Sequence, residues 1–141
     1  MKYSYVIFTI LTVLVFSACK QVKKHSSNSV KEQAFPIKTI SVATLKAHRK
    51  VKKGLLLDVR TPEETVEGHI EAAVFLDYYR SDFQTQIQKF PKDEPVYIYC
   101  RSGNRSRKAA QKLAALGFRD VYNIEGGFQA WKTAEIGNGS N

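Results

Sequence analysis

The chain has 141 residues, enough for one domain with little room for a second, and its 43% hydrophobic and 25% charged residues exclude a fibrous or wholly disordered protein. Its net charge of +9 is unevenly spread, because residues 20–53 hold ten Lys or Arg against one acid, whereas residues 54–141 hold eleven against twelve. Since the larger part of the chain is nearly neutral, we do not expect a nucleic acid as its partner.

The N-terminus has the three parts of a secretory signal peptide. Lys2 supplies a charged start, an apolar run follows over Val6–Phe16, and Ser17 and Ala18 form a small-residue cleavage site. The apolar run is shorter than the ~20 residues that cross a bilayer. A signal peptide over residues 1–18 is therefore favoured over a permanent membrane helix.

Cys19 stands at the predicted cleavage site. The segment Phe16-Ser17-Ala18-Cys19 resembles the lipobox of bacterial lipoproteins, although Phe16 replaces the usual Leu. This resemblance implies lipidation of Cys19, export, and a membrane-anchored location facing the periplasm or the cell surface; an ordinary secreted cysteine is the alternative. Residues 19–34 are polar and aperiodic, so we interpret them as a flexible tether whose basic side chains favour anionic lipid headgroups.

Strands and helices alternate over residues 35–134, which we assign to one folded domain, followed by a tail over residues 135–141. The predicted strands are Ile37–Ile40, Leu55–Val59, a buried strand Ala72–Leu76, Pro95–Tyr99, and a last one within Phe118–Ile124. The predicted helices are Ser41 to about Lys50, Thr61 to about Glu67, Ser81 or Asp82 to Pro91, and Ser106–Leu116. Short connections between alternating elements predict a doubly wound α/β fold, with a mostly parallel central sheet and helices on both faces.

Two polar residues follow or end predicted strands. Asp58 lies near the end of one strand, and Cys100 directly follows another. Ligands of parallel α/β sheets bind beyond the carboxyl ends of the strands. Both side chains are therefore expected at the functional edge of the sheet.

Cys100 begins the loop Cys100-Arg101-Ser102-Gly103-Asn104-Arg105, which leads into a helix. A cysteine nucleophile must be a thiolate, and both a helix N-terminus and nearby arginines favour the charged form. The central residues of the loop tolerate a tight, partly left-handed backbone, whose amide N–H groups can form an anion-binding nest. A reactive thiolate is favoured over the alternative, a buried and inert cysteine.

Three motifs in this order resemble those of rhodanese domains. They are Leu57–Arg60 with Glu64, Gly68–Ile70 and Ala73, then Tyr97–Ser106 with the helix that follows, and then Asn123–Gly127 with Trp131. Ala72 departs from the family's usual glycine, and the chain ends soon after Trp131, which leaves little room for a long closing helix. The resemblance covers roughly residues 37–132 and implies a ping-pong reaction: the cysteine takes sulfane sulfur from a donor such as thiosulfate, becomes a persulfide, and passes the sulfur to a thiophile.

The loop supplies a residue for each role in this reaction. Cys100 is assigned as the nucleophile, Arg101 and Arg105 as substrate contacts, and the amides of Ser102, Gly103, Asn104 and Arg105 as the cradle. Asp58, Arg60 and Ser106 are interpreted as supports behind these groups. The expected partners are a small anionic sulfur donor and a thiol or cyanide-like acceptor, with a thioredoxin-like protein as one candidate; no metal or cofactor is expected.

Two other functions stay open. Cysteine phosphatases place an arginine six positions after the cysteine, whereas position 106 is serine and Arg105 comes five positions after Cys100. The shorter loop fits a sulfur atom better than a phosphate, so phosphatase activity is the weaker alternative. The other is a persulfide carrier or a thiol-based redox or binding module that does not turn over as an enzyme.

Overall fold

The computed structural model describes residues 35–138, so the predicted signal peptide, Cys19 and the tether lie outside the described residues. Strands and helices alternate along this part of the chain. They are β1 (Ile37–Ile40), α2 (Val42–Val51), β2 (Leu55–Asp58), α3 (Pro62–Val66), β3 (Val74–Phe75), α4 (Phe83–Ile87), β4 (Val96–Tyr99), α5 (Asn104–Ala115), β5 (Val121–Ile124) and α6 (Gly127–Asn138).

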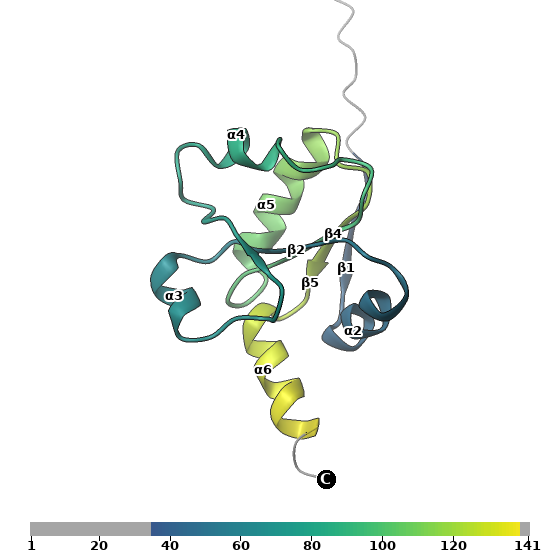
Figure 1. Cartoon of the computed structure of the whole chain (residues 1–141), viewed down its shortest axis with the longest axis vertical. Helices are drawn as coiled ribbons and strands as arrows, with labels where there is room; N and C mark the ends of the chain where they lie inside the picture. The colour runs from purple at the N-terminus through teal and green to yellow at the C-terminus, as the bar shows by residue number, and fades with distance from the viewer. Residues whose placement is uncertain (1–34, 139–141) are drawn as a thin grey trace, which may run out of the picture. The chain divides into compact units, whose positions relative to one another are not determined.

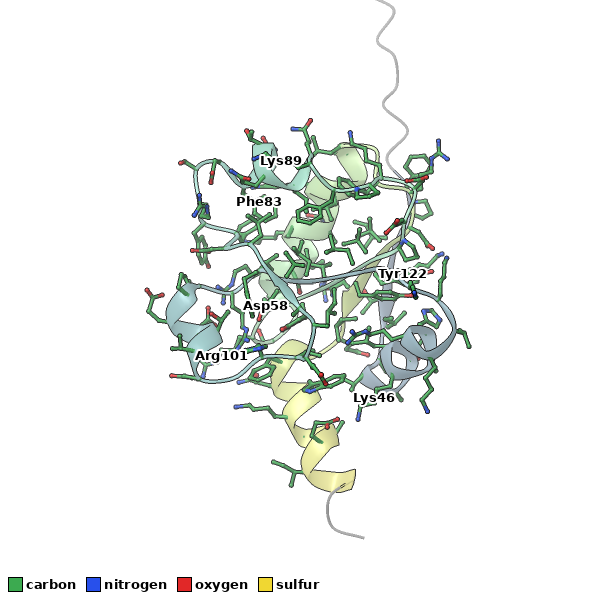
Figure 2. All side chains as sticks on the ribbon, in the orientation of Figure 1. Lys46, Asp58, Phe83, Lys89, Arg101 and Tyr122 are labelled. Atoms are coloured by element: carbon green, nitrogen blue, oxygen red, sulfur yellow. The ribbon has the colours of Figure 1, made fainter. Side chains whose placement is uncertain are left out.

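The five strands form one sheet in the order β1-β5-β4-β2-β3, and every neighbouring pair is parallel. Figure 1 shows α4 and α5 on one side of this sheet and α2 and α6 on the other. Figure 2 places Phe83 on the first side and Lys46 on the second. The predicted doubly wound α/β fold is therefore confirmed, and the order of strands in the sheet places β4 at its centre.

Side chains alternate between the two faces of β4 and therefore pack in two hydrophobic cores, one on each side of the sheet. Val96, Ile98 and Cys100 pack on the α5 side, whereas Tyr97 and Tyr99 pack on the other. All five are at most 1% exposed, as expected of a central strand that is covered on both faces. The strand's two-residue period thus decides that the Cys100 side chain turns toward α5.

Helix α5 presents a small, partly polar face to the sheet. Ser106, Ala109, Ala110 and Leu113 are buried at the spacing of one helical face. The two alanines let the helix approach the strands closely, and Ser106 is the polar member of this face. Its position one turn into the helix brings its hydroxyl near the thiol of Cys100.

The prediction of a buried strand over Ala72–Leu76 is wrong. Strand β3 has two residues, and Val74 and Phe75 are 38% and 49% exposed. The reason is its place at the edge of the sheet, where it pairs with β2 alone and is uncovered on its outer side. Within the predicted span, only Leu76 lies in the core on the α5 side.

Both C-terminal helices differ from the sequence prediction. Helix α5 begins at Asn104, two residues earlier than predicted, because Gly103 adopts a left-handed conformation (φ 95°) and forms its N-cap. Helix α6 has 12 residues, so residues 135–138 of the predicted tail continue a closing helix that the sequence appeared too short to hold. Within residues 35–138, no helix has the length and apolar character needed to span a membrane.

Candidate active site

Cys100 lies directly after β4, at the carboxyl edge of the sheet, with 1% of its surface exposed. Its Sγ accepts a hydrogen bond from the Gly103 amide at 3.2 Å, and the Ser106 hydroxyl lies 3.6 Å away. Both donors belong to the N-terminal turn of α5. The thiol therefore faces the positive end of a helix, where a thiolate is favoured.

The pKa of the Cys100 thiol reflects two opposing effects. Burial raises the pKa, because it removes the charged form from water. Hydrogen bonds from the backbone and hydroxyl of Ser106 and from the amides of Ser102 and Gly103 lower it. The hydrogen bonds prevail, so the pKa lies below the ordinary value of a thiol.

Two glycines allow the loop to fold this tightly. Gly103 has a φ of 95°, and a Cβ there would lie 3.2 Å from the carbonyl oxygen of Ile124. Gly127 has a φ of 55°, and its Cβ would collide with the carbonyl oxygen of Cys100. A side chain would therefore be strained by the positive φ at both positions, and at Gly127 it would also collide with the loop.

The start of α6 holds the loop from the opposite side of the sheet. The amide of Phe128 donates to the Cys100 carbonyl at 2.8 Å, and the amide of Gln129 donates to the Arg101 carbonyl at 3.0 Å. These amides belong to the first turn of α6, whose N–H groups have no partners within the helix. The first turn of α6 therefore supplies backbone donors that fix the first two residues of the loop.

Arg105 forms an ion pair with a residue from another motif. Its guanidinium donates to both carboxylate oxygens of Glu64, at 2.7 and 2.9 Å, and lies 5.2 Å from the ring centroid of Tyr79. The hydrogen bonds from Arg105 lower the pKa of the Glu64 carboxyl. Because Glu64 also accepts from the Thr61 amide at 3.1 Å, one carboxylate connects the first turn of α3 to the first turn of α5.

Asp58 and Arg60 form a buried pair on the α6 side. The Arg60 guanidinium donates to Asp58 at 2.6–3.0 Å, and the two residues are 3% and 0% exposed. The same guanidinium donates to the carbonyls of Glu64 and Gly68 and lies 4.1 Å from the ring centroid of Phe128. The pair thus reaches Arg105 indirectly, because it anchors the backbone of the helix that carries Glu64.

The remaining loop residues are exposed. Ser102 and Asn104 lie at the surface, and Arg101 lines a cavity of about 250 Å³ with Glu64, Phe128 and Lys132 among its walls. Figure 2 shows Arg101 between α3 and the start of α6. The structure therefore brings Cys100, Gly103 and Ser106 together at the thiol, and places Arg101 and Arg105 at its rim. Within residues 35–138, no cluster of three His, Cys, Asp or Glu side chains could hold a metal ion.

Two residues at this site were not assigned a place there from the sequence. Glu64 was quoted within a motif without a role at this site, and its contact with Arg105 joins two motifs through residues 41 positions apart. Asn123 was quoted within a motif without a role, and its side-chain oxygen lies 2.7 Å from the Ser106 hydroxyl. A polar residue inside an otherwise apolar strand was the available signal for Asn123.

Comparisons with known proteins agree with this architecture. The family profile of the Rhodanese-like domain matches residues 41–134. Thiosulfate sulfurtransferase GlpE of Pseudomonas syringae is 40% identical over 80 residues, which span 56% of this chain and 73% of that protein.

Two solved structures are also similar to this chain. A rhodanese-like domain protein from Staphylococcus aureus has a TM-score of 0.60 and 37% identity, and the match covers 67% of this chain and 90% of that one. A protein of unknown function from Rhodopseudomonas palustris, described as a possible tyrosine phosphatase, has a TM-score of 0.60 and 28% identity, with coverage of 70% and 82%.

Proposed function

This chain belongs to the rhodanese-like domain family, and from that premise we propose that it is a sulfurtransferase that carries sulfane sulfur as a persulfide on Cys100. The observation that carries the proposal is the thiol itself. Cys100 Sγ faces the first turn of α5, where the Gly103 amide and the Ser106 hydroxyl can both donate to a thiolate. A sulfur nucleophile with a lowered pKa is what the first half of the reaction needs.

The reaction proceeds in two displacements. The Cys100 thiolate attacks the outer sulfur of thiosulfate, the sulfur–sulfur bond of the donor breaks, and sulfite leaves with the bonding electron pair. Cys100 then holds a persulfide. In the second displacement a thiophile attacks the outer persulfide sulfur, and the Cys100 thiolate leaves; cyanide as acceptor gives thiocyanate.

The rim of the site suits an anionic donor. Arg101 is an exposed residue of the loop, and Arg105 lies in the first turn of α5 with its guanidinium toward Glu64. Such groups stabilise the charge that develops on the departing sulfite. Because Glu64 already occupies Arg105, a donor anion has to compete with that carboxylate for the guanidinium.

Two other candidate functions are supported by specific observations. The low exposure of Cys100 supports a persulfide carrier that is loaded by a partner, such as a thioredoxin-like protein, and turns over slowly on small molecules. The similarity to a protein described as a possible tyrosine phosphatase supports phosphate-ester hydrolysis. The five-residue step from Cys100 to Arg105 favours sulfur chemistry over phosphate-ester hydrolysis, and turnover on small molecules is what distinguishes the enzyme from the carrier.

One experiment distinguishes the three functions. The full chain is incubated with thiosulfate, and its intact mass is measured before and after cyanide. We expect a gain of one sulfur that cyanide removes as thiocyanate over many cycles, with no gain in Cys100→Ser. Loading without turnover would establish the carrier instead, and hydrolysis of an aryl phosphate without sulfur uptake would overturn the proposal.

We further propose that the protein is exported and anchored by a lipid on Cys19. The support is the sequence of residues 1–19, with its charged start, apolar run, small residues and cysteine. The test compares the native chain with Cys19→Ala by cell fractionation. We expect the native protein with the membranes and the variant released from them, and unchanged membrane attachment of the variant would refute the lipid anchor.

A further inference from the structure

A buried polar chain runs from β5 to the thiol. Asn123 lies on β5, and Val121, two residues earlier on the strand, packs in the core on the α5 side. Because side chains alternate along a strand, Asn123 faces the same side. Asn123 and Ser106 are 1% and 0% exposed. The Ser106 hydroxyl lies 2.7 Å from Asn123 Oδ1 and 3.6 Å from Cys100 Sγ, so it stands between the amide and the sulfur.

The hydrogen-bond donors and acceptors along this row of buried polar groups do not match. The single hydroxyl hydrogen of Ser106 has three acceptors within reach, which are Asn123 Oδ1, Cys100 Sγ, and the Gly103 carbonyl at 3.1 Å. Asn123 Nδ2 is buried without any hydrogen-bond partner. A buried donor in this condition costs about 1–3 kcal/mol, so this arrangement of hydrogens is unfavourable.

Rotating the Asn123 amide by half a turn gives its nitrogen a hydrogen-bond partner and leaves Oδ1, instead of Nδ2, at the position without one. The oxygen and nitrogen of a side-chain amide are nearly the same size, and the hydrogen-bond network decides which is which. After the rotation Nδ2 takes the place of Oδ1 and donates to Ser106 Oγ. The hydroxyl hydrogen is then free for Cys100 Sγ, and a charged thiolate is a stronger acceptor than the neutral Gly103 carbonyl.

We propose that Asn123 is a positioning residue, whose amide donates to the Ser106 hydroxyl and thereby directs the hydroxyl hydrogen to the sulfur of Cys100. The inference rests on the proposed role of Cys100 as nucleophile. The link from Asn123 to the sulfur runs through the Ser106 hydroxyl. It makes β5 a third contributor to the thiolate, beside the amides of the loop and the first turn of α5.

The charged groups around the thiol belong to other elements. Arg105 on α5 interacts electrostatically with Cys100, and its partner Glu64 lies on α3. Asp58 is the last residue of β2 and forms an ion pair with Arg60 just beyond the strand. Substituting Asn123 by alanine leaves all four charges in place, so a change in the titration of Cys100 reports on the hydrogen-bond chain.

A double-mutant cycle tests the proposal. Asn123→Ala, Ser106→Ala and the double variant are made in a Cys19→Ala background, where Cys100 is the remaining thiol, and thiolate absorbance is titrated against pH. We expect Asn123→Ala to reduce the thiolate fraction at neutral pH about three- to tenfold. In the Ser106→Ala background the same substitution should change it less than about twofold.

Two further variants serve as controls. Asn123→Asp keeps the shape of the side chain but offers only acceptors, so it should draw the hydroxyl hydrogen away and reduce the thiolate fraction at least as strongly. Tyr122→Phe removes a polar group from the neighbouring position on the opposite face of β5 and should leave the titration unchanged. The new carboxylate also disfavours the thiolate through its charge. Asn123→Asp is therefore compared with and without the Ser106 hydroxyl, and this comparison carries the test if Asn123→Ala does not fold.

The results separate this inference from the proposed function. Equal effects of Asn123→Ala with and without the Ser106 hydroxyl, or an unchanged titration in a folded Asn123→Asp, would overturn the positioning role. Neither measurement needs sulfur transfer. A chain that titrates as expected but takes up no sulfur would contradict the proposed function and leave the role of Asn123 intact.

Discussion

Arg105 holds Glu64 by two hydrogen bonds, at 2.7 and 2.9 Å, so the arginine that the loop offers to an anion already binds one that the chain supplies. Both side chains are only partly buried, at 15% and 25% exposure. A pair in this setting contributes about 1 kcal/mol or less. The carboxylate is therefore a competitor that a substrate anion can displace.

Removing the negative charge of Glu64 should strengthen the binding of thiosulfate. In Glu64→Gln the amide keeps an oxygen for the Thr61 N–H but loses its charge, so we expect the KM for thiosulfate to fall by about fivefold, the equivalent of ~1 kcal/mol. Steady-state kinetics with cyanide measure this. Glu135→Gln, which removes the Lys46 partner on α6, is the matched control and should leave KM unchanged. A higher KM in Glu64→Gln would show that the pair positions Arg105 instead of occupying it.

The pH dependence of Cys100 alkylation should report a lowered thiol pKa. Because hydrogen bonds to the thiolate outweigh its burial, the midpoint of the iodoacetamide rate against pH should lie below the ~8.5 of a free thiol. The rate profile is measured in Cys19→Ala, with glutathione as reference and the Cys19→Ala/Cys100→Ser double variant as the blank. A midpoint at or above that of glutathione contradicts the geometry of the loop.

The same pKa difference predicts a direction for stability. The folded pKa lies below the unfolded one, so ionised Cys100 adds stability that is fully present above the unfolded pKa and is lost as pH falls through the folded pKa. The free energy of unfolding should thus rise with pH between these two values, relative to Cys100→Ser. Urea unfolding at a series of pH values measures the difference, and a slope of opposite sign would refute the expectation.

Two glycines of α6 should respond oppositely to alanine. In Gly127→Ala the new methyl group meets the carbonyl of Cys100 at a positive φ, so we expect a loss of several kcal/mol, on the scale of large single-site effects, together with slower alkylation of Cys100. In Gly137→Ala nothing lies within 4 Å, and the helix should gain up to about 1 kcal/mol. Chemical unfolding of both variants checks this, and equal effects would mean that the contact with the loop is unimportant.

Replacing Ala72 by glycine, the residue usual in the family at this position, should stabilise the protein. It has a φ of 60° and an exposed side chain, so its methyl group strains the turn without burying surface. Ala72→Gly should raise the free energy of unfolding by about 1 kcal/mol. Ala73→Gly is the matched control, because Ala73 packs against the core on the α6 side and its loss should destabilise the protein. Destabilisation by Ala72→Gly would show that the strain at this turn is smaller than the cost of glycine's freedom.

Local signals predicted most elements because each is written in a few neighbouring residues. The apolar run that ends in Tyr99 forms a central strand, and Thr61, Pro62 and Glu64 start a short helix where expected. The edge strand was misjudged for the same reason. An apolar run of five residues looks alike whether or not a neighbour covers it, and burial depends on the order of strands in the sheet.

The sequence by itself predicted the loop, since Cys100 and the residues up to Arg105 are consecutive, and the structure shows the Gly103 amide donating to the sulfur. Only the tertiary structure decided which distant groups meet there. Glu64 comes from α3, Asn123 from β5, and the amides of Phe128 and Gln129 from α6. The physical reason is that parallel strands carry their carboxyl ends to one edge of the sheet, so partners of Cys100 are chosen by strand order and helix placement, which no local pattern records.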